Sequence, residues 1–234
     1  MSVDVSKPGA SVPVHRVRFV DWSPSAITAL ALSPVAWTES AAVGRSVLAI
    51  GRDNGNIDLC TWCEGQSGSI AQGWSPVWTL LGEENYKIES LAFTASASHL
   101  RLFSTSGGSI VSEHYLPSSL TGQHAADTRT PTRTLSSHGG AIWSMAASPT
   151  GKFLAIGCED GVVRLIDVAG DAFEHVGTGM HVAPRMTRVA SRILSLAWGP
   201  PRRQMATSND SDDDNDEAWR ETYLLARLGS SSAG

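Results

Sequence analysis

The sequence has 234 residues, which at roughly 150 residues per domain allows one large domain or two small ones. Apolar residues make up 41% and charged residues 18%, so the chain can build a core and has too little charge for a disordered protein. The net charge is -5, but residues 210–217 hold six of the 23 acids, which leaves 17 acids against 18 bases elsewhere. A strongly basic, histone-like nucleic-acid binder is therefore excluded.

Cysteine content and hydropathy limit the cellular compartments in which we expect this chain. Cys60, Cys63 and Cys158 are too few, and odd in number, for a secreted disulfide scaffold. The N-terminus lacks the apolar stretch of a signal peptide, and no stretch approaches the ~20 apolar residues that span a bilayer. We expect a soluble intracellular chain that does not enter a membrane, with residues 1–13 as a disordered N-terminal segment.

After the N-terminal segment, the sequence consists of short apolar runs separated by glycine-containing turns. This pattern is typical of strands. They form a repeat in which a strand, a second strand, a hairpin turn and a third strand recur in one order. The first copy occupies residues 27–34, 48–51, 54–55 and 56–60. The second occupies 88–93, 100–103, 107–108 and 109–112. The third and clearest occupies 141–148, 153–157, 160–161 and 162–168, and a fourth begins at 193–198.

The spacing of the copies favours propeller blades. Ile27, Ile88, Ile142 and Ile193 are 61, 54 and 51 residues apart, more than the ~40–45 residues of an uninterrupted propeller repeat. The surplus lies in connections such as 63–76 and 117–133, which we expect to be surface loops. Three short strands with room for a fourth make a blade. A β-sandwich has strands at similar intervals but does not explain the fixed order.

We therefore predict an all-β fold, an incomplete β-propeller of about three blades plus part of a fourth. Residues 14–198 form blades one to three and the first strand of blade four. Residues 199–221 are expected to be an acidic disordered loop, and residues 222–234 a partial strand with an irregular tail. Such an arc leaves an open strand edge and an uncovered blade face, which partners or further blades must cover.

The third copy resembles the WD-repeat superfamily. His138 lies four residues before Ile142, where that family has the histidine of its Gly-His pair. Asp160 and Gly161 match the hairpin turn, which needs positive φ, and Asp167 stands at the place of the aspartate of Trp-Asp. The resemblance implies that His138 hydrogen-bonds to Asp160 and keeps the strands in register. The structural blade residues are therefore His138, Asp160, Gly161, Asp167 and, in the first copy, Asn54 and Gly55.

A closer resemblance, to the cirhin family, is carried by residues 14–21, 27–30, 48–57 and 188–198 and ends after 199. Cirhin-family proteins are WD-repeat components of the small-subunit processome, the nucleolar assembly on nascent pre-ribosomal RNA, and are much longer, with two propellers. The resemblance implies a non-catalytic nucleolar scaffold whose partners are other processome proteins and pre-ribosomal RNA. The alternative is a generic WD-repeat adaptor, such as a substrate receptor of a ubiquitin ligase.

Enzyme chemistry is not supported, because the nucleophile-elbow, phosphate-loop and His-Glu-x-x-His motifs are absent. We expect no catalytic residue, cofactor, metal or small-molecule substrate. Cys60 and Cys63 have the spacing of half a zinc site, but a structural zinc needs four ligands, so we favour a buried Cys60. Ser33 and Ser148 precede prolines, which preset φ for turns, and we assign both serines to turns rather than to phosphorylation.

The densest positive segment precedes and follows the start of the fourth copy. Its members Arg185, Arg188, Arg192, Arg202 and Arg203 are candidates for contact with RNA phosphates. A solvated loop explains them equally well, and there is no aromatic interleaving of the kind that stacks bases. Ser211, followed at once by three aspartates, is a candidate phosphosite for an acid-directed kinase.

Overall fold

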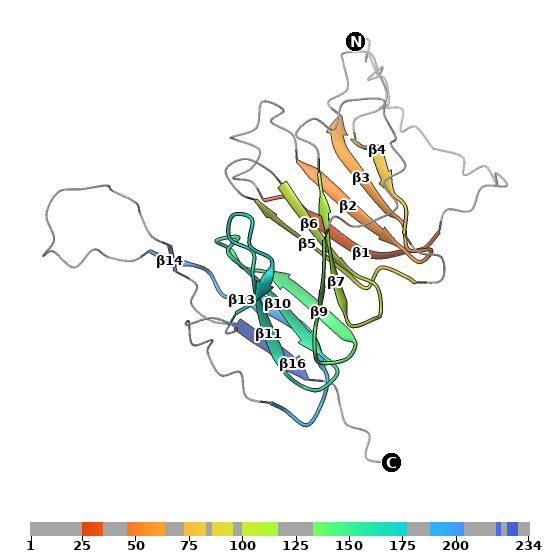
Figure 1. The fold of residues 1–234 in the computed structure, drawn as a ribbon. Coiled ribbons are helices and arrows are strands. Elements are labelled where there is room, and N and C mark those ends of the chain that lie inside the picture. Colours follow the sequence, from red (N-terminus) through yellow and green to blue (C-terminus); the bar gives the residue numbers. More distant parts are fainter. Residues whose placement is uncertain are drawn as a thin grey trace, which may run out of the picture.

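A computed structural model describes residues 25–34, 46–63, 73–82, 86–95, 100–116, 133–176, 188–203, 219–220 and 224–228. Within these ranges the chain forms sixteen strands in five antiparallel sheets (Figure 1). Three sheets have four strands each, hydrogen-bonded in chain order, and we call them blades one to three. In this part of the chain there is no helix that could cross a membrane.

The blades follow one another along the sequence. Blade one consists of β1 (Ile27–Leu32), β2 (Val47–Arg52), β3 (Ile57–Cys63) and β4 (Gly73–Leu80). Blade two consists of β5 (Ser90–Ala95), β6 (Leu100–Thr105), β7 (Ile110–Tyr115) and β8 (Arg133–Ser136). Blade three consists of β9 (Ile142–Ala147), β10 (Phe153–Cys158), β11 (Val163–Asp167) and β12 (Glu174–His175). The fourth unit pairs β13 (Ile193–Trp198) with β16 (Leu224–Leu228), and β14 (Arg202–Arg203) pairs with β15 (Trp219–Arg220).

The hydrophobic core lies between the sheets, in three clusters. The first joins blades one and two and includes Leu59 and Leu102, both 0% exposed. The second joins blades two and three through residues such as Phe103 and Ile156. The third joins blade three to the fourth unit and includes Ile193. Neighbouring side chains of a strand point to opposite faces, and blades two and three each contribute to two clusters. Blades two and three therefore bury apolar side chains on both faces.

Figure 1 shows the blades side by side in chain order. The first strand of each sheet contacts the first strand of the next, so β1, β5, β9 and β13 lie in sequence. Stacked four-stranded sheets with their first strands innermost are the arrangement of a β-propeller. The prediction of an all-β, incomplete propeller is confirmed.

The outermost strands were not predicted as strands. The connection 63–76, expected to be a loop, contains the start of β4, which pairs with β3 along its length, with Leu59 opposite Trp78. Gly73 and Pro76 made this segment read as a loop, but proline is tolerated in the outermost strand of a sheet because one side of that strand needs no partner. The connection 117–133 likewise ends in β8.

One predicted boundary near the C-terminus needs correction, and the partial strand expected there is present. The segment 199–221, expected to be disordered throughout, contains β14 and β15, which pair Arg202 with Arg220 and Arg203 with Trp219. The expected partial strand within 222–234 is β16, which pairs antiparallel with β13 as the second strand of the fourth unit. Residues 1–13 lie outside the described part of the chain.

The hairpin turns have one residue more than predicted. Gly161 N donates to the Cys158 carbonyl at 3.2 Å, and Cys158 N to the Val162 carbonyl at 3.3 Å. The loop is therefore three residues, 159–161, with Gly161 in the left-handed region at φ 75°, as in a type I turn followed by a glycine bulge. Blade one repeats this geometry, with Gly55 at φ 84°. The prediction of two-residue turns was wrong, but the positive φ at both glycines is confirmed.

The turns after β1 and β9 are closed by serine hydroxyls. Ser33 Oγ accepts from Val47 N at 2.9 Å, and Ser148 Oγ accepts from Phe153 N at 3.0 Å. Both serines are buried, at 4% and 5% exposed. These contacts confirm that the two serines belong to the turns.

Two left-handed glycines of blade three form a matched pair for substitution. A Cβ on Gly161 would lie 2.0 Å from the Val189 carbonyl oxygen, whereas a Cβ on Gly170 (φ 55°) would meet nothing within 4 Å. Gly170→Ala should cost roughly 1–2 kcal/mol, the strain of the left-handed conformation alone. Gly161→Ala should cost clearly more, because backbone must also move. Urea unfolding of the two variants measures the difference, and equal losses would contradict the described packing of this turn.

Candidate functional site

A group of charged and aromatic side chains lies where the loops of blade three meet the start of β13. Trp143 comes from β9, Glu159 and Asp160 from the β10–β11 turn, and Arg164 from β11. The segment before β13 adds Arg188 and Arg192. We call these six residues the blade-three cluster.

Asp160 is the polar centre of this cluster. Arg164 donates from Nη1 to Oδ1 at 2.9 Å and from Nη2 to Oδ2 at 2.7 Å, a bidentate pair. Hydrogen bonding from Arg164 lowers the pKa of the Asp160 carboxyl, and the same contact raises the pKa of the guanidinium. Val162 N also donates to Oδ1 at 3.2 Å, and Arg188 Nε donates to the Asp160 carbonyl at 3.0 Å. The turn therefore joins β11 to the segment that leads into β13.

Trp143 provides the exposed aromatic surface of the cluster. Its side chain is 39% exposed, and its indole N–H donates to the Glu159 carboxylate. The Arg192 guanidinium lies 4.6 Å from the centroid of the ring, a cation–π contact worth about 0.5–1 kcal/mol at an exposed site. Both side chains are thus held in place by contacts within the cluster. Tryptophan and arginine are the residue types that most often dominate protein interfaces.

His138 does not play the predicted role. Arg164, rather than His138, is the partner of the Asp160 carboxylate. The His138 backbone is left-handed, at φ 53°, its carbonyl accepts from Arg164 Nη2 at 3.3 Å, and its ring lies 5.2 Å from that of His175. A bidentate guanidinium–carboxylate pair is stronger than a single hydrogen bond between neutral groups, and Arg164 makes the contact with Asp160 that the resemblance assigned to His138.

The side chains of Asn54 and Asp167 each accept a hydrogen bond from the backbone of the turn that they begin or precede. Asn54 Oδ1 accepts from Asn56 N at 3.2 Å, as Asp160 accepts from Val162, and Asn54 N donates to Ser25 Oγ at 3.0 Å. Asp167 Oδ1 accepts from Ala169 N at 2.9 Å. Each side chain satisfies a backbone N–H that its turn leaves without a strand partner.

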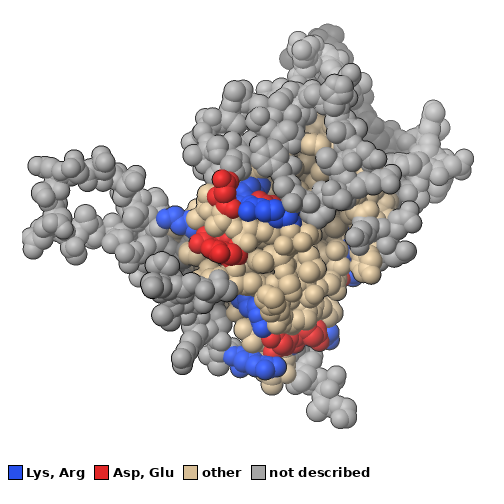
Figure 2. Space-filling model, in the orientation of Figure 1, with Lys and Arg blue, Asp and Glu red and all other residues tan. Residues whose placement is uncertain are grey.

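Among the arginines proposed for RNA contact, those whose side chains the structure describes have acids beside them. Arg188 and Arg192 lie in the blade-three cluster, where acids accompany them, and Arg202 and Arg203 lie on β14. Figure 2 shows blue and red side chains intermixed on the face that it draws. Arg185 and Ser211 lie outside the described residues.

Cys60 is buried, as the sequence analysis expects. Cys60 is 4% exposed and Cys158 is 0% exposed. Burial raises the pKa of both thiols, which keeps them in the protonated, unreactive form. Nothing is described of the Cys63 side chain.

A cavity of about 420 Å³ lies between blades one and two. On its wall Ser104 Oγ and His114 Nε2 are 2.8 Å apart. Burial lowers the pKa of His114 to about 4, so its imidazole is neutral at pH 7. A catalytic serine–histidine pair needs a third group to orient the base, but the Glu113 carboxylate, next in the chain, is bound by two arginines. The pair therefore satisfies the buried Ser104 hydroxyl and the half-buried His114 ring.

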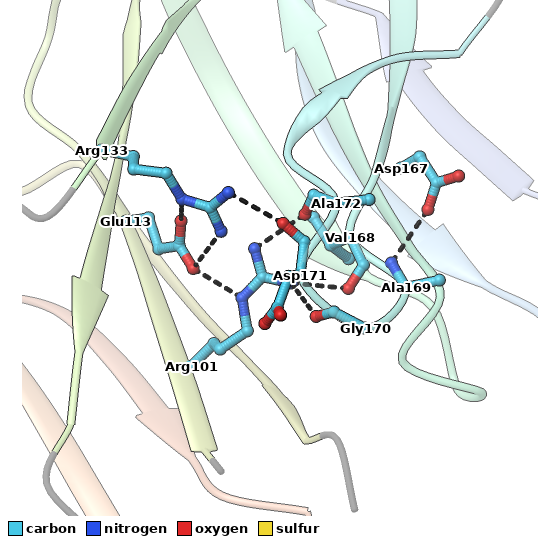
Figure 3. A network of polar contacts seen from close by, with 9 residues as sticks. All are labelled: Arg101, Glu113, Arg133, Asp167, Val168, Ala169, Gly170, Asp171 and Ala172. Carbon is cyan, nitrogen blue, oxygen red and sulfur yellow. Dashed lines mark hydrogen bonds and ion pairs between the residues drawn. The ribbon is translucent and has the colours of Figure 1, made fainter. Parts of the chain in front are cut away.

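Sequence reasoning missed an ionic joint between blades two and three (Figure 3). Arg101, 2% exposed, donates from Nε to Glu113 at 2.6 Å. Its Nη1 and Nη2 reach the turn after β11, with bonds of 2.7, 2.9 and 2.8 Å to the carbonyls of Val168, Gly170 and Ala172. The only signal in the sequence is an arginine inside the apolar run of β6.

Arg133 completes this joint. It donates from Nε to Glu113 at 2.6 Å and from Nη1 to the Asp171 carbonyl at 2.8 Å. Burial raises the pKa of Glu113, but the hydrogen bonds from Arg133 and Arg101 outweigh it and bring the pKa below its ordinary value. The carboxylate therefore stays charged and holds both arginines against blade three.

Comparison with known protein families identifies the third copy of the repeat. The family described as "WD domain, G-beta repeat" matches residues 129–167, a stretch that includes the strands from β8 to β11. This confirms the WD-type repeat predicted for the third copy. The match covers only that part of the chain.

The chain is also similar to curated proteins. It is 33% identical over 79% of its length to U3 small nucleolar RNA-associated protein 4 of Saccharomyces cerevisiae, covering 21% of that protein. Identity to the protein of the same name in Schizosaccharomyces pombe is 34% over 78% of the chain and 22% of the relative. The human homolog is 30% identical over 84% of the chain and 23% of the relative. The chain thus spans about a fifth of the length of the relatives it matches.

Solved structures also align with the chain, at low sequence identity. A chain of Chaetomium thermophilum Polycomb Repressive Complex 2 aligns with a TM-score of 0.48 and 16% identity, over 62% of this chain and 29% of that one. The computationally designed Ika4 protein aligns with a TM-score of 0.44 and 17% identity, over 87% of this chain and 94% of that one.

Removing the shared carboxylate should weaken the joint more than removing its exposed arginine. Glu113→Gln leaves Arg101 buried without a counter-charge and should cost about 3 kcal/mol. Arg133→Met, at a side chain 42% exposed, should cost about 1 kcal/mol or less. Urea unfolding of both variants provides the comparison. A loss for Glu113→Gln no larger than for Arg133→Met would contradict the role of the joint.

Proposed function

We propose that this chain is a non-catalytic scaffold subunit in ribosome biogenesis, corresponding to the N-terminal part of a cirhin-family protein. The observation that carries the proposal is its 30–34% identity to proteins named for association with the U3 small nucleolar RNA, over 78–84% of the chain. Its role is to support pre-ribosomal RNA processing and small-subunit assembly in the nucleolus through contacts with other processome proteins.

The geometry supports a role in protein contacts. The described site holds no assembled catalytic group, and its most prominent surface feature is the pre-positioned pair Trp143 and Arg192. A rigid aromatic side chain flanked by arginine loses little conformational entropy on binding. We propose that the blade-three cluster is the contact surface for a neighbouring processome protein.

Direct RNA contact by Arg185, Arg188, Arg192, Arg202 and Arg203 remains a prediction. The mixture of acids and bases in the cluster favours a protein partner, whose charges can be matched in sign one by one. A phosphate backbone is instead neutralised by several cations, with affinity that falls steeply with salt. The chain covers about a fifth of its relatives, so it carries only part of the contacts of such a protein.

Affinity purification from cells tests this function. The tagged chain should recover U3 small nucleolar RNA and small-subunit precursors from nuclear extract. Trp143→Ala combined with Arg192→Ala should lower this recovery by about tenfold, the effect of 1.4 kcal/mol in binding, since both contact residues are removed. Val77→Ala, which also shortens an exposed apolar side chain (37% exposed) but on β4, should leave the recovery unchanged.

Two outcomes would overturn the proposal. Recovery of ubiquitin-ligase subunits without the U3 RNA would replace the scaffold function by the adaptor alternative. Equal recovery by the double variant and the Val77→Ala control would show that the blade-three cluster is not the contact surface.

A further inference from the structure

The cavity between blades one and two has walls of different chemistry. Ile57 and Leu80 of blade one and Ile88 of the connection after it form an apolar wall, and they are 2%, 5% and 4% exposed. Blade two contributes hydroxyls and an imidazole, from Ser104, Ser106, Ser112, Thr134 and His114. The cavity volume of about 420 Å³ lies within the range of about 300–1,000 Å³ of ligand pockets. A ligand with one apolar and one polar side therefore has room and partners here.

The repeat shows why the cavity exists. Strand pairing and sequence order align Ser104 of blade two with Ile156 of blade three, and His114 with Ile166. Ile156 and Ile166 are 0% exposed and belong to the cluster that joins blade three to blade two. A serine fills less space than an isoleucine, so the same position in blade two leaves room against blade one.

The polar groups of blade two have hydrogen-bonding capacity left for a ligand. The contact between Ser104 Oγ and His114 Nε2 uses one ring nitrogen, whereas a neutral imidazole has one donor and one acceptor. The hydroxyls of Ser106, Ser112 and Thr134 make no hydrogen bond to the part of the chain that the structure describes. These groups can both donate to and accept from an entering polar atom.

The charges around the cavity disfavour an ionic ligand. Among the described residues, none that lines the cavity is charged at pH 7, since the His114 pKa is about 4. The charged residues next to lining positions are already paired: Lys87 with Glu89, Asp58 with Arg52, and Glu113 with Arg101 and Arg133. A carboxylate or phosphate entering the cavity would lose its water without gaining a counter-charge, and RNA needs cations for its phosphates. The ligand is therefore uncharged.

We propose that the cavity between blades one and two binds a tyrosine side chain of a neighbouring protein. The ring packs against the apolar wall of blade one, and the phenol hydroxyl, both donor and acceptor, bonds to the polar groups of blade two. Buried tyrosine hydroxyls need such a partner. The choice of a protein as the source rests on the scaffold function proposed above. The site shares no residue with the blade-three cluster, so it is a second contact surface.

Nuclear magnetic resonance with N-acetyl-tyrosinamide as the probe tests the chemistry of the cavity. Titration of the isotope-labelled chain should shift the amide signals of Ser104, Ser112 and His114 and reach saturation. N-acetyl-phenylalaninamide should bind about fivefold more weakly, because it lacks one hydrogen bond. Phosphotyrosine and a single-stranded uridine oligonucleotide should leave these signals unchanged, since both are anionic.

A matched pair of variants locates the site. Ser112→Val removes a hydroxyl from the cavity and should weaken probe binding about fivefold. Ser90→Val makes the same change at a half-buried residue of β5 outside the cavity and should leave binding unchanged. The comparison of the four probes on the unmodified chain needs no variant, so it decides the matter if Ser112→Val fails to fold.

Cross-linking tests whether the ligand belongs to a protein. Lys87 lies beside Ile88 and its side chain is 52% exposed, so it is an accessible amine at the cavity. In the purification from nuclear extract, Lys87 should cross-link to a tyrosine-containing peptide of another protein. Ser112→Val should reduce this cross-link about fivefold and Ser90→Val should not. Recovery of U3 RNA in the same purification tests the scaffold function separately.

Three outcomes would overturn the proposal. Tyrosine and phenylalanine probes of equal affinity would mean that the polar wall does not select the ligand. Shifts with the uridine oligonucleotide but not with N-acetyl-tyrosinamide would make the site an RNA contact. Lys87 cross-links that are unaffected by Ser112→Val, with probe binding intact, would mean that no protein side chain enters the cavity.

Discussion

Burial of apolar side chains between neighbouring sheets is the constraint on which this structure depends. A four-stranded sheet of this size has little core of its own, and Leu59, Leu102, Phe103 and Ile156 become fully buried only because another blade covers them. Burying each such side chain contributes about 1.5–3 kcal/mol. Each blade is therefore stabilised by its neighbours, and the two end units bury the least apolar surface.

Polar contacts add orientation to this apolar packing. Arg101 donates to three carbonyls of the turn after β11, and Arg188 donates to the Asp160 carbonyl, so the bonds of both arginines cross from one unit to the next. Removing the counter-charge of a buried arginine costs more free energy than the intact pair contributes. The ionic joint between blades two and three therefore favours the one placement of these blades in which Arg101 keeps its partners. The same relative placement of units presents Trp143 and Arg192 together on the surface.

Local signals in the sequence were sufficient for the first three strands of each blade and for the positions of the turn glycines. Gly55 and Gly161 were predicted to need positive φ from their neighbours alone, and the repeat of apolar runs located the first three strands of each blade. Contacts between distant segments were not predictable. The choice of Arg164 over His138 as the partner of Asp160 depends on side-chain geometry across a hairpin, and the role of Arg101 depends on a turn 67 residues away. β4 was missed because Gly73 and Pro76 indicate a loop unless the strand is known to be outermost.

The dependence of each blade on its neighbour can be measured by hydrogen exchange in a core variant. Leu102→Ala removes side-chain atoms from β6 in blade two that pack in the cluster shared with blade one. If the blades are stabilised by one another, amide protection should fall in β2 and β3 of blade one as much as in β6 and β7. Loss of protection confined to blade two would contradict this account, because it would mean that each sheet is stable by itself.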